Sequence, residues 1–387
     1  MGEKKYYYFD NAATSWPKPE AVYRAVDTAL RSGGSPGRSG HQRTLAAERQ
    51  LFEAREKVAA FFGAQEPSSL IFTLNATDAL NMAIKGLLNK GDHVLTTPFE
   101  HNSVARPLNA MARDGIITVT EIPCTDEGTL DLRELSSLFR PNTALVAAAH
   151  ASNVSGYLLP VKELAAAAQA RQVPFLLDAA QTAGVYPLDV KDLPADMLVF
   201  AGHKGTLGPQ GVGGLILKEG IGLRPWREGG TGSRSHEVLQ PAIMPDYLEA
   251  GTMNMPGIAG LQAGIAYIQS VGLENIRSHE VKLASMLREG LKKIPGTRVY
   301  GPADPKDGVA VVSFTLEGVD CGDVGFILEE VYGILCRTGL HCAPGAHRCL
   351  GTFPQGTIRL SPGFSTSEED AAYVLKAVAE IAAEAGL

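Results

Sequence analysis

The amino-acid sequence predicts an α/β protein with two domains. The larger is expected to hold a mostly parallel seven-stranded sheet between helices, and the smaller to be of the α+β type. The chain has 387 residues, which is long for one domain and suits two. Between about residues 68 and 217, short apolar runs alternate with helical stretches, as in parallel sheets covered on both faces. Beyond residue 272 this alternation stops.

The seven expected strands of the large sheet are short and almost wholly apolar. Their ranges are 68–74 (SSLIFTL), 92–98 (DHVLTTP), 116–122 (IITVTEI), 143–152 (TALVAAAHAS), 173–180 (VPFLLDAA), 195–202 (ADMLVFAG) and 212–218 (VGGLILK). Helices are expected between them, for example at 78–88, 103–114 and 161–172. Strands joined through helices pair in parallel, which gives the predicted sheet.

The smaller domain follows a connecting segment at 249–272, expected to be a loop leading into a long helix. Strands are expected at 308–316 and 356–363, helices near 322–333 and at 366–385, and a loop at 337–342. The N-terminal residues are expected to pack against this part. The predicted division is therefore a large domain at 16–255 and a small domain formed by 1–15 and 256–387.

Composition excludes several classes of protein. A net charge of −7 argues against a dedicated nucleic-acid binder, which needs a basic face. No apolar run is long enough to span a membrane, and the first residues lack the apolar core of a secretory signal. Five cysteines in 387 residues are typical of a cytoplasmic protein rather than of a disulfide framework.

Polar residues follow five of the expected strands, where ligands bind in open α/β sheets. They are Asn75 and Thr77, Glu100 and His101, His150 and Asn153, Asp178 and Gln181, and His203 and Lys204. Because the carboxyl ends of parallel strands meet at one edge, these residues are expected to form one site.

Asp178 and Lys204 indicate a chemistry for that site. A lysine that forms a Schiff base and an aspartate that pairs with a pyridinium nitrogen are what pyridoxal 5′-phosphate requires. The alternative is a structural salt bridge between the two. Thr77 stands where a strand turns into a helix, a place suited to a phosphate, although it could equally be an ordinary helix cap. His101 could stack on the cofactor ring or be merely structural.

Nine segments in this order resemble the class V aminotransferase family of fold-type-I pyridoxal-phosphate enzymes, and within it the cysteine desulfurases and selenocysteine lyases. They are YFDNAATS (8–15), NATDALN (75–81), FEHNS (99–103), ASNVSG (151–156), LLDAAQ (176–181), FAGHKGTLGPQGVG (200–213), EAGTMN (249–254), RTGLHCA (337–343) and IRLSPGFSTSEED (358–370). Together they span nearly the whole chain.

The resemblance implies a role for each matching residue. Lys204 would bond the cofactor, Asp178 pair with its ring nitrogen, Gln181 contact its ring hydroxyl, and His101 stack on the ring and shuttle protons. Thr77 and His203 would bind the phosphate, with Thr252 supplied to it by the partner of a homodimer. Asn153 would hold substrate and cofactor, and Arg359 would bind the substrate carboxylate. Cys342 would be the nucleophile that accepts sulfur.

The implied activity is a cysteine desulfurase that converts L-cysteine into L-alanine and leaves a persulfide on Cys342. An acceptor protein would take this sulfur for iron–sulfur cluster or thio-cofactor assembly. The alternatives are a selenocysteine lyase acting on L-selenocysteine and a class V aminotransferase without desulfurase activity. Two departures from the family pattern stand out. Ala201 replaces a hydroxyl residue that often binds the phosphate, and the sequence after Cys342 differs from the better-known bacterial desulfurases.

The segment RTGLHCAPGAHRC (337–349) allows other interpretations. His341, Cys342, His347 and Cys349 could bind zinc, but structural zinc sites usually take ligands from two separated pairs, and no metal is expected. Cys342 could also be a small buried apolar residue. If it is the nucleophile, Arg337, His341 and His347 are the neighbours able to favour its thiolate. Cys349 could be incidental, a second sulfur relay, or a disulfide partner for Cys342.

The glycine-rich stretch 33–44 lacks the lysine pattern of a nucleotide-binding loop. In the family this region reaches toward the partner subunit, which adds Arg38 and His41 to the candidate residues.

Overall fold

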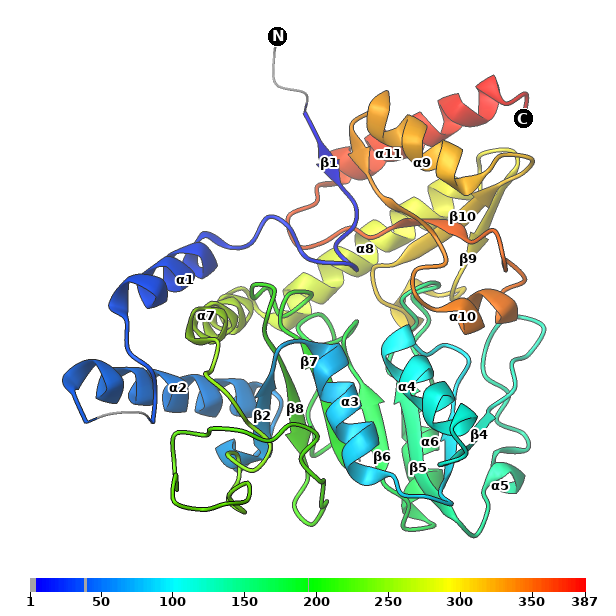
Figure 1. Ribbon diagram of the computed structural model, residues 1–387. Helices are drawn as coiled ribbons and strands as arrows, with labels where there is room; N and C mark the ends of the chain where they lie inside the picture. Colours follow the sequence, from blue (N-terminus) through cyan, green and yellow to red (C-terminus); the bar gives the residue numbers. More distant parts are fainter. Residues whose placement is uncertain (1–4, 38–39, 194) are drawn as a thin grey trace.

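The computed structural model describes residues 5–37, 40–193 and 195–387, so Arg38 and the first four residues lie outside the described part. Its larger sheet confirms the predicted seven strands, in the order β2-β8-β7-β6-β5-β3-β4 (Figure 1). They are β2 (Leu70–Thr73), β3 (His93–Thr96), β4 (Thr118–Glu121), β5 (Thr143–Ala149), β6 (Phe175–Asp178), β7 (Met197–Ala201) and β8 (Gly213–Leu217). Strand β8 runs antiparallel to β2 and β7, and the other neighbouring pairs are parallel.

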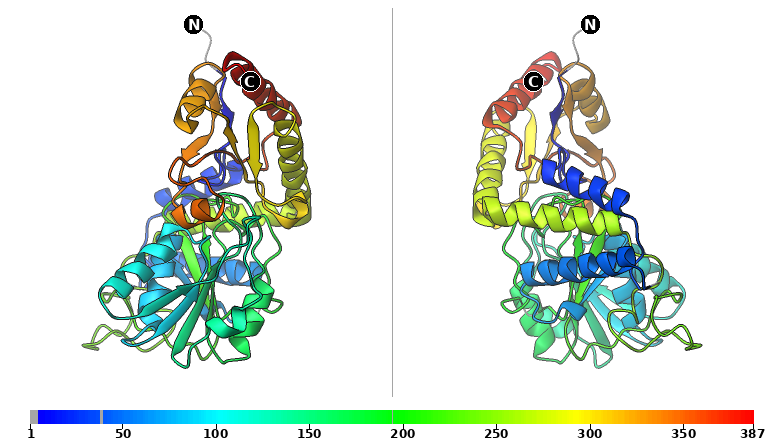
Figure 2. Two further views of the ribbon diagram at one scale, coloured as in Figure 1. Left: turned by 90° about the vertical axis from the view of Figure 1, so that its right-hand side faces the viewer. Right: turned by 90° about the vertical axis from the view of Figure 1, so that its left-hand side faces the viewer.

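Helices cover both faces of this sheet (Figure 2). One face packs against α3 (Ala76–Leu87) and α4 (Asn102–Arg113), and the other against α2 (Gln42–Phe61), α6 (Val161–Gln169) and α7 (Met255–Val271). Strand side chains alternate between these two cores, since Phe175 and Leu177 join one and Leu176 joins the other. Helix α1 (Glu20–Ser32) lies along α7, and α5 (Leu135–Leu138) and the 3-10 turn η1 (Pro67–Ser69) are short connectors.

The second sheet is antiparallel, in the order β12-β13-β10-β9. Its strands are β9 (Thr297–Tyr300), β10 (Val312–Leu316), β12 (Arg337–Gly339) and β13 (Thr357–Leu360). Helices α8 (Leu273–Leu291), α9 (Cys321–Glu330) and α11 (Glu368–Glu384) share its core, and η2 (Pro305–Asp307) precedes β10. Near the N-terminus, β1 (Tyr7–Tyr8) pairs in parallel with β11 (Ile334–Leu335).

Residues 337–339 differ from the expectation, because they form strand β12 rather than loop. Their backbone pairs with β13, which sets Arg337 opposite Arg359. The pairing satisfies backbone groups that a loop would have to leave to water. Only the residues after Gly339 form the expected loop, which leads into α10 (Pro344–Cys349).

Helix α10 joins the two parts of the molecule. It lies between the two sheets in Figure 1 and follows directly on the small sheet in sequence. Ala343 and Ala346, however, are fully buried in the core of the large sheet. The loop before α10 is therefore held by one sheet at each end.

Arg288 on α8 also connects the two parts. Its Nη2 donates to the carbonyl oxygens of Ser155, after β5, and Val311, before β10, at 3.0 and 2.8 Å. Its Nη1 donates to the carbonyl oxygen of Tyr300 at 3.2 Å. The side chain is 3% exposed, so these carbonyls replace water as its partners.

No helix within the described residues is both long enough and apolar enough to span a bilayer.

Candidate active site

The expected site residues lie at the carboxyl edge of the large sheet. Asp178 is the last residue of β6, and its backbone pairs with Ala149 of β5 and Val199 of β7. Lys204 lies in the turn after β7, and Asn153 in the turn after β5. His101 and Thr77 occupy the beginnings of α4 and α3. Parallel strands thus bring together residues that are far apart in the sequence.

Asp178 and Lys204 interact electrostatically but do not form a direct ion pair with one another. Burial lowers the pKa of Lys204 to about 8, and Asp178 partly offsets this effect. Burial raises the pKa of Asp178, whose Oδ1 accepts a hydrogen bond from the backbone N–H of Ala180 at 2.9 Å. The alternative of a structural salt bridge is therefore not met, and the amine and the carboxylate both remain able to bind a cofactor ring.

His101 is neutral at physiological pH and has one fixed tautomer. Burial, with the charges of Lys204 and Arg337, lowers the pKa of His101 to about 4. Its Nδ1 accepts the backbone N–H of Ser103 at 3.1 Å, so the proton of the neutral ring is on Nε2. The hydroxyl of Ser103 lies 2.8 Å from the same Nδ1 and 2.7 Å from Oγ1 of Thr77. Ser103 therefore links the expected ring-stacking and phosphate-binding residues.

Groups around the expected phosphate position suit an anion. The first N–H groups of α3, which begins after its cap Asn75, have no acceptor within the helix. Nδ1 of His203 is buried without a hydrogen-bond partner, and Lys18 Nζ donates to the carbonyl oxygen of His203 at 2.8 Å. Burial lowers the pKa of His203 to about 4, so its neutral ring can donate only one hydrogen bond. Ala201 offers no hydroxyl here, and its carbonyl oxygen accepts from Thr206.

Arg359 forms the deepest charged part of the site. It is 1% exposed, and its Nη2 donates to Oδ1 of Asp10 at 2.6 Å. Its Nη1 donates to the carbonyl oxygen of Asn153 at 3.1 Å, while its Nε has no partner. Oδ1 of Asn153 also lacks a partner. A substrate with a carboxylate and an amine would supply an acceptor to the guanidinium and a donor to the amide.

The Cys342 loop is held over this edge by hydrogen bonds from both sheets. Asn153 Nδ2 donates to the carbonyl oxygen of His341 at 2.6 Å, and the backbone N–H of Asn102 donates to that of Cys342 at 2.7 Å. Nη2 of Arg337 lies 3.4 Å from Sγ of Cys342. His341 and Cys342 both have positive φ, 48° and 61°, a backbone conformation that costs energy for residues other than glycine.

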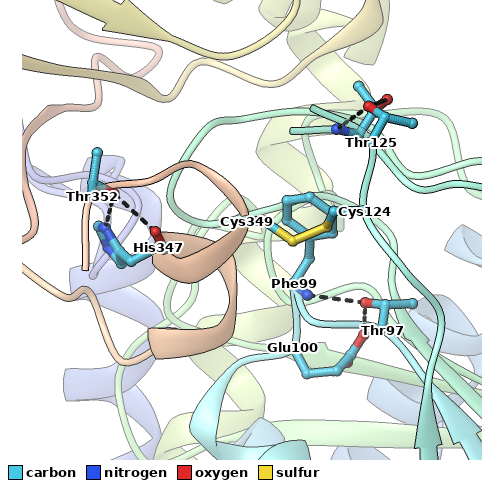
Figure 3. The surroundings of a disulfide bond; sticks show 9 residues. Thr97, Phe99, Glu100, Cys124, Thr125, His347, Cys349 and Thr352 are labelled. Carbon is cyan, nitrogen blue, oxygen red and sulfur yellow. Dashed lines mark hydrogen bonds between the residues drawn. A yellow bond between two sulfur atoms is a disulfide. The ribbon is translucent and has the colours of Figure 1, made fainter. Parts of the chain in front are cut away.

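Arg337 is the one of three expected neighbours that places a positive charge beside Sγ of Cys342. Burial, with the charge of Arg359, lowers the pKa of His341 to about 2, and burial lowers that of His347 to about 4. Both rings are therefore neutral at physiological pH. His341 Nε2 is paired with the hydroxyl of Thr357, and His347 Nδ1 with that of Thr352 (Figure 3).

Gln181 and Thr252 are placed differently. Gln181 lines a hollow that it shares with Lys204, and its Nε2 donates to the carbonyl oxygen of Ala12 at 3.1 Å. Thr252 is exposed and lies beside a separate hollow with Phe52, Arg55 and Glu249. The chain thus does not bring Thr252 to its own Lys204, and the contribution of Thr252 to a partner's site stays a prediction.

Two expectations about the cysteines need correction. Cys349 forms a disulfide with Cys124, with Cα atoms 6.0 Å apart, so it does not pair with Cys342 (Figure 3). Two of the five cysteines are therefore paired, against the expected reduced pattern. The sequence could not show this bond, because 225 residues separate its ends. Cys321, Cys336 and Cys342 are free, and no three His, Cys, Asp or Glu side chains of the described residues gather as metal ligands would.

Some of the site residues were not foreseen. Asp10 lies within the conspicuous YFDNAATS segment, yet nothing in the sequence indicates that it binds Arg359. Ser103 likewise belongs to the segment FEHNS, without a signal that its hydroxyl lies between Thr77 and His101. Glu100 is expected only as a strand-end residue. Its Oε1 accepts from Thr97 at 2.6 Å (Figure 3). The same Oε1 accepts from the backbone N–H of Ala149 at 2.9 Å, which ties the end of β3 to β5.

The residues present fit pyridoxal 5′-phosphate. A buried lysine with a lowered pKa and a buried aspartate interact electrostatically without forming an ion pair. Polar atoms of His203, Asn153 and Arg359 make no hydrogen bond within the chain and could bind a polar ligand. Lys204 would hold the aldehyde carbon, Asp178 the ring nitrogen, and the beginning of α3 with His203 the phosphate.

Comparisons with known proteins agree with this geometry. The family model for class-V aminotransferases matches residues 7–374. A probable cysteine desulfurase from Methanothermobacter thermautotrophicus is 34% identical over 98% of this chain and 95% of its own length. A cysteine desulfurase from Pectobacterium atrosepticum is 33% identical over 87% of this chain and 84% of its own.

Solved structures agree as well. The apo cysteine desulfurase of Thermococcus onnurineus superimposes with a TM-score of 0.92 at 36% identity, over 99% of this chain and 95% of its own. The cysteine desulfurase CsdA of Escherichia coli gives a TM-score of 0.87 at 29% identity, over 97% and 94%. The chain therefore belongs to the class-V aminotransferase family, within the group of the cysteine desulfurases.

Proposed function

We propose that this protein is a pyridoxal-phosphate-dependent cysteine desulfurase that converts L-cysteine into L-alanine and holds the removed sulfur as a persulfide on Cys342. The observation that supports this most is the position of the Cys342 loop. Asn153 and Asn102, at the carboxyl edge of the large sheet, hold the backbone of the loop beside Lys204 and Asp178. An aminotransferase would have no use for a thiol held at this place.

The family implies use of pyridoxal phosphate, and the chemistry which that group supplies is an electron sink for the substrate's α-carbon. Arg359 binds the substrate carboxylate, with Asp10 behind it to fix the guanidinium plane. The neutral amine of Lys204 takes the α-proton. His101, with its proton on Nε2, can donate a hydrogen bond into the site from that nitrogen.

The sulfur transfer uses Cys342 as its thiolate, with the guanidinium of Arg337 close to Sγ. Sγ of Cys342 attacks the substrate sulfur and forms an S–S bond. The Cβ–Sγ bond of the substrate breaks, its electron pair stays on carbon, and a proton completes alanine. The products are alanine and the Cys342 persulfide, so one thiol and one cysteine are consumed without an external oxidant.

Further parts of the proposal concern the protein's surroundings. A homodimer is supported by the exposed position of Thr252, away from the Lys204 of its own chain. An acceptor protein for the persulfide, supply of iron–sulfur or thio-cofactor assembly, and a cytoplasmic location complete it.

The test is a single turnover without added thiol. Purified protein loaded with cofactor is mixed with L-cysteine, and alanine and protein-bound sulfur are counted per site. Wild type is expected to form about one alanine and one Cys342 persulfide per site, and Cys342→Ala neither. Cys336→Ala, which removes another free cysteine, is the matched control and should behave as wild type.

The outcomes separate the alternatives. Alanine from L-selenocysteine but not from L-cysteine, also in Cys342→Ala, would identify a selenocysteine lyase. Amino transfer to a keto acid with no protein-bound sulfur would identify an aminotransferase. A protein that binds no cofactor would refute the proposal altogether.

A further inference from the structure

The Cys124–Cys349 disulfide links α10 to the segment that follows β4, the last strand at one edge of the large sheet (Figure 3). Cys349 is the last residue of α10, and Cys124 lies in the segment between β4 and α5. Their Cα separation of 6.0 Å lies within the usual range for a disulfide. Both residues are half-buried, so the bond is partly open to a small reagent.

Helix α10 packs tightly against the segments around it. A Cβ atom placed at Gly345 would lie 2.3 Å from the carbonyl oxygen of Pro98, so the helix backbone touches the β3–α4 segment. At the other end, the side chain of Leu350 lies against Gly128, where a Cβ would be 2.8 Å from it. The disulfide covalently closes a contact that is already tight.

The packing of α10 also positions Cys342, the proposed nucleophile. A single residue, Ala343, separates Cys342 from the helix, and it is fully buried in the core of the large sheet. On its other side the loop is held by Arg337 and Asn102. With α10 fixed, Cys342 has almost no chain available for movement away from the site.

Movement of this kind follows from the proposed function, on which this inference rests. The thiol of Cys342 must face the substrate to accept its sulfur, and the persulfide must then reach a separate acceptor. The strained φ angles of His341 and Cys342 favour release of the loop once the contacts that hold it are broken. The strongest of the contacts that hold the loop is the covalent Cys124–Cys349 bond, which a reductant can break.

We propose that Cys124 and Cys349 form a redox-active site whose reaction partner is a small dithiol, and that its oxidation state controls how far the Cys342 loop can move. A dithiol attacks one sulfur of the pair, forms a mixed disulfide, and leaves as its own cyclic disulfide. Cys124 and Cys349 become thiols, having gained two electrons and two protons. Oxidation of the pair by a disulfide reverses the step and fastens α10 again.

The test follows the exposure of Cys342 by alkylation. Full-length protein is oxidised with a disulfide reagent, or reduced with a dithiol that is then removed, and treated with iodoacetamide. Peptide mass spectrometry gives the rate at which Cys342 is modified. The reduced protein is expected to react at least about tenfold faster than the oxidised protein, because the loop then opens locally. Equal rates within a factor of two would overturn the proposal.

Matched variants exclude other causes. Cys349→Ser and Cys124→Ser should both react at the fast rate whatever the redox treatment, with unchanged circular dichroism. Cys321→Ser, which leaves the pair intact, should keep the redox response of wild type. A response that persists in Cys349→Ser would refute the assignment, as would oxidised wild type without a Cys124–Cys349 linked peptide.

The two proposals fail separately, because alkylation does not require catalysis. A redox-dependent alkylation rate without alanine formation would refute the proposed function and keep the redox site. Alanine formation with a redox-independent alkylation rate would refute the redox site alone.

Discussion

The buried ion pair between Arg55 and Glu249 gives a sharp prediction about stability. The two side chains are 7% and 5% exposed and form two hydrogen bonds of 2.8 and 2.7 Å. The backbone N–H of Phe72 on β2 donates to the same carboxylate at 2.7 Å. Glu249 also begins the segment EAGTMN, which holds Thr252. The ion pair therefore holds together α2, β2 and the segment proposed to meet the partner subunit.

The change to test is Glu249→Gln, which preserves the size of the side chain and removes its charge. Arg55 then stays charged in a site without water, and breaking a buried pair in this way costs about 3–5 kcal/mol. This corresponds to an equilibrium constant of unfolding that rises roughly 150- to 5,000-fold. Urea titrations of both proteins, followed by circular dichroism, measure the difference.

Two controls make the result decisive. Asp27→Asn breaks the pair with Arg31, whose side chains are 59% and 78% exposed, and should leave the urea midpoint unchanged. The double change Arg55→Met and Glu249→Met should recover most of the loss, because no unpaired charge is left behind. A loss below about 1 kcal/mol for Glu249→Gln would refute the reasoning, since an unpaired buried charge would then cost no more than a neutral group.

Three further predictions concern the site and the disulfide. The rate at which cofactor-free protein takes up pyridoxal phosphate should rise with pH and level off above about 8, because the neutral amine of Lys204 is the reacting form and its pKa is lowered to about 8. At pH 7 about one tenth of the Lys204 amine is then neutral, compared with roughly 1 in 3,000 at the usual pKa of a lysine. An uptake rate that still climbs tenfold per pH unit between pH 9 and 10 would contradict the lowered pKa. Arg359→Lys should lower kcat/KM for L-cysteine about 10- to 150-fold through loss of a charge-assisted hydrogen bond worth roughly 1.5–3 kcal/mol. The same change at exposed Arg298 is the control, and equal losses in both variants would argue against a substrate contact. Reduction of the Cys124–Cys349 bond, whose ends are 225 residues apart, should destabilise the protein by up to about 5 kcal/mol in the chain-entropy estimate. A dithiol should thus lower the urea midpoint of wild type but not of Cys124→Ser.

The seven strands of the large sheet and most of the site could be predicted from the sequence because both depend on local patterns. Apolar runs mark buried strands, and polar residues at their ends must meet once the strands are parallel. The contact between Asp10 and Arg359 could not be predicted in this way, because it joins two side chains 349 residues apart in the sequence. The disulfide and the packing of α10 could not be predicted from the sequence for the same reason.

The expectation about the thiolate shows a different limit. His341 and His347 stand beside Cys342 in the sequence, and either could have supplied positive charge. Their pKa values depend on burial, which is decided by packing against both sheets and not by neighbours along the chain. Of the three expected neighbours, Arg337 is the one that carries a charge next to Sγ, because a guanidinium is protonated at any physiological pH.

The hydrogen bonds from Arg288 to the carbonyl oxygens of Ser155, Val311 and Tyr300 have a consequence for how substrate enters. Moving the two parts of the molecule apart would break the hydrogen bond from this buried guanidinium to Ser155, while those to Tyr300 and Val311 stay with the small part. Separation of the two parts is therefore the costly route. A substrate amino acid is instead admitted by movement of short segments between them. The body of this protein acts as a rigid frame, and only a few residues near the thiol need travel.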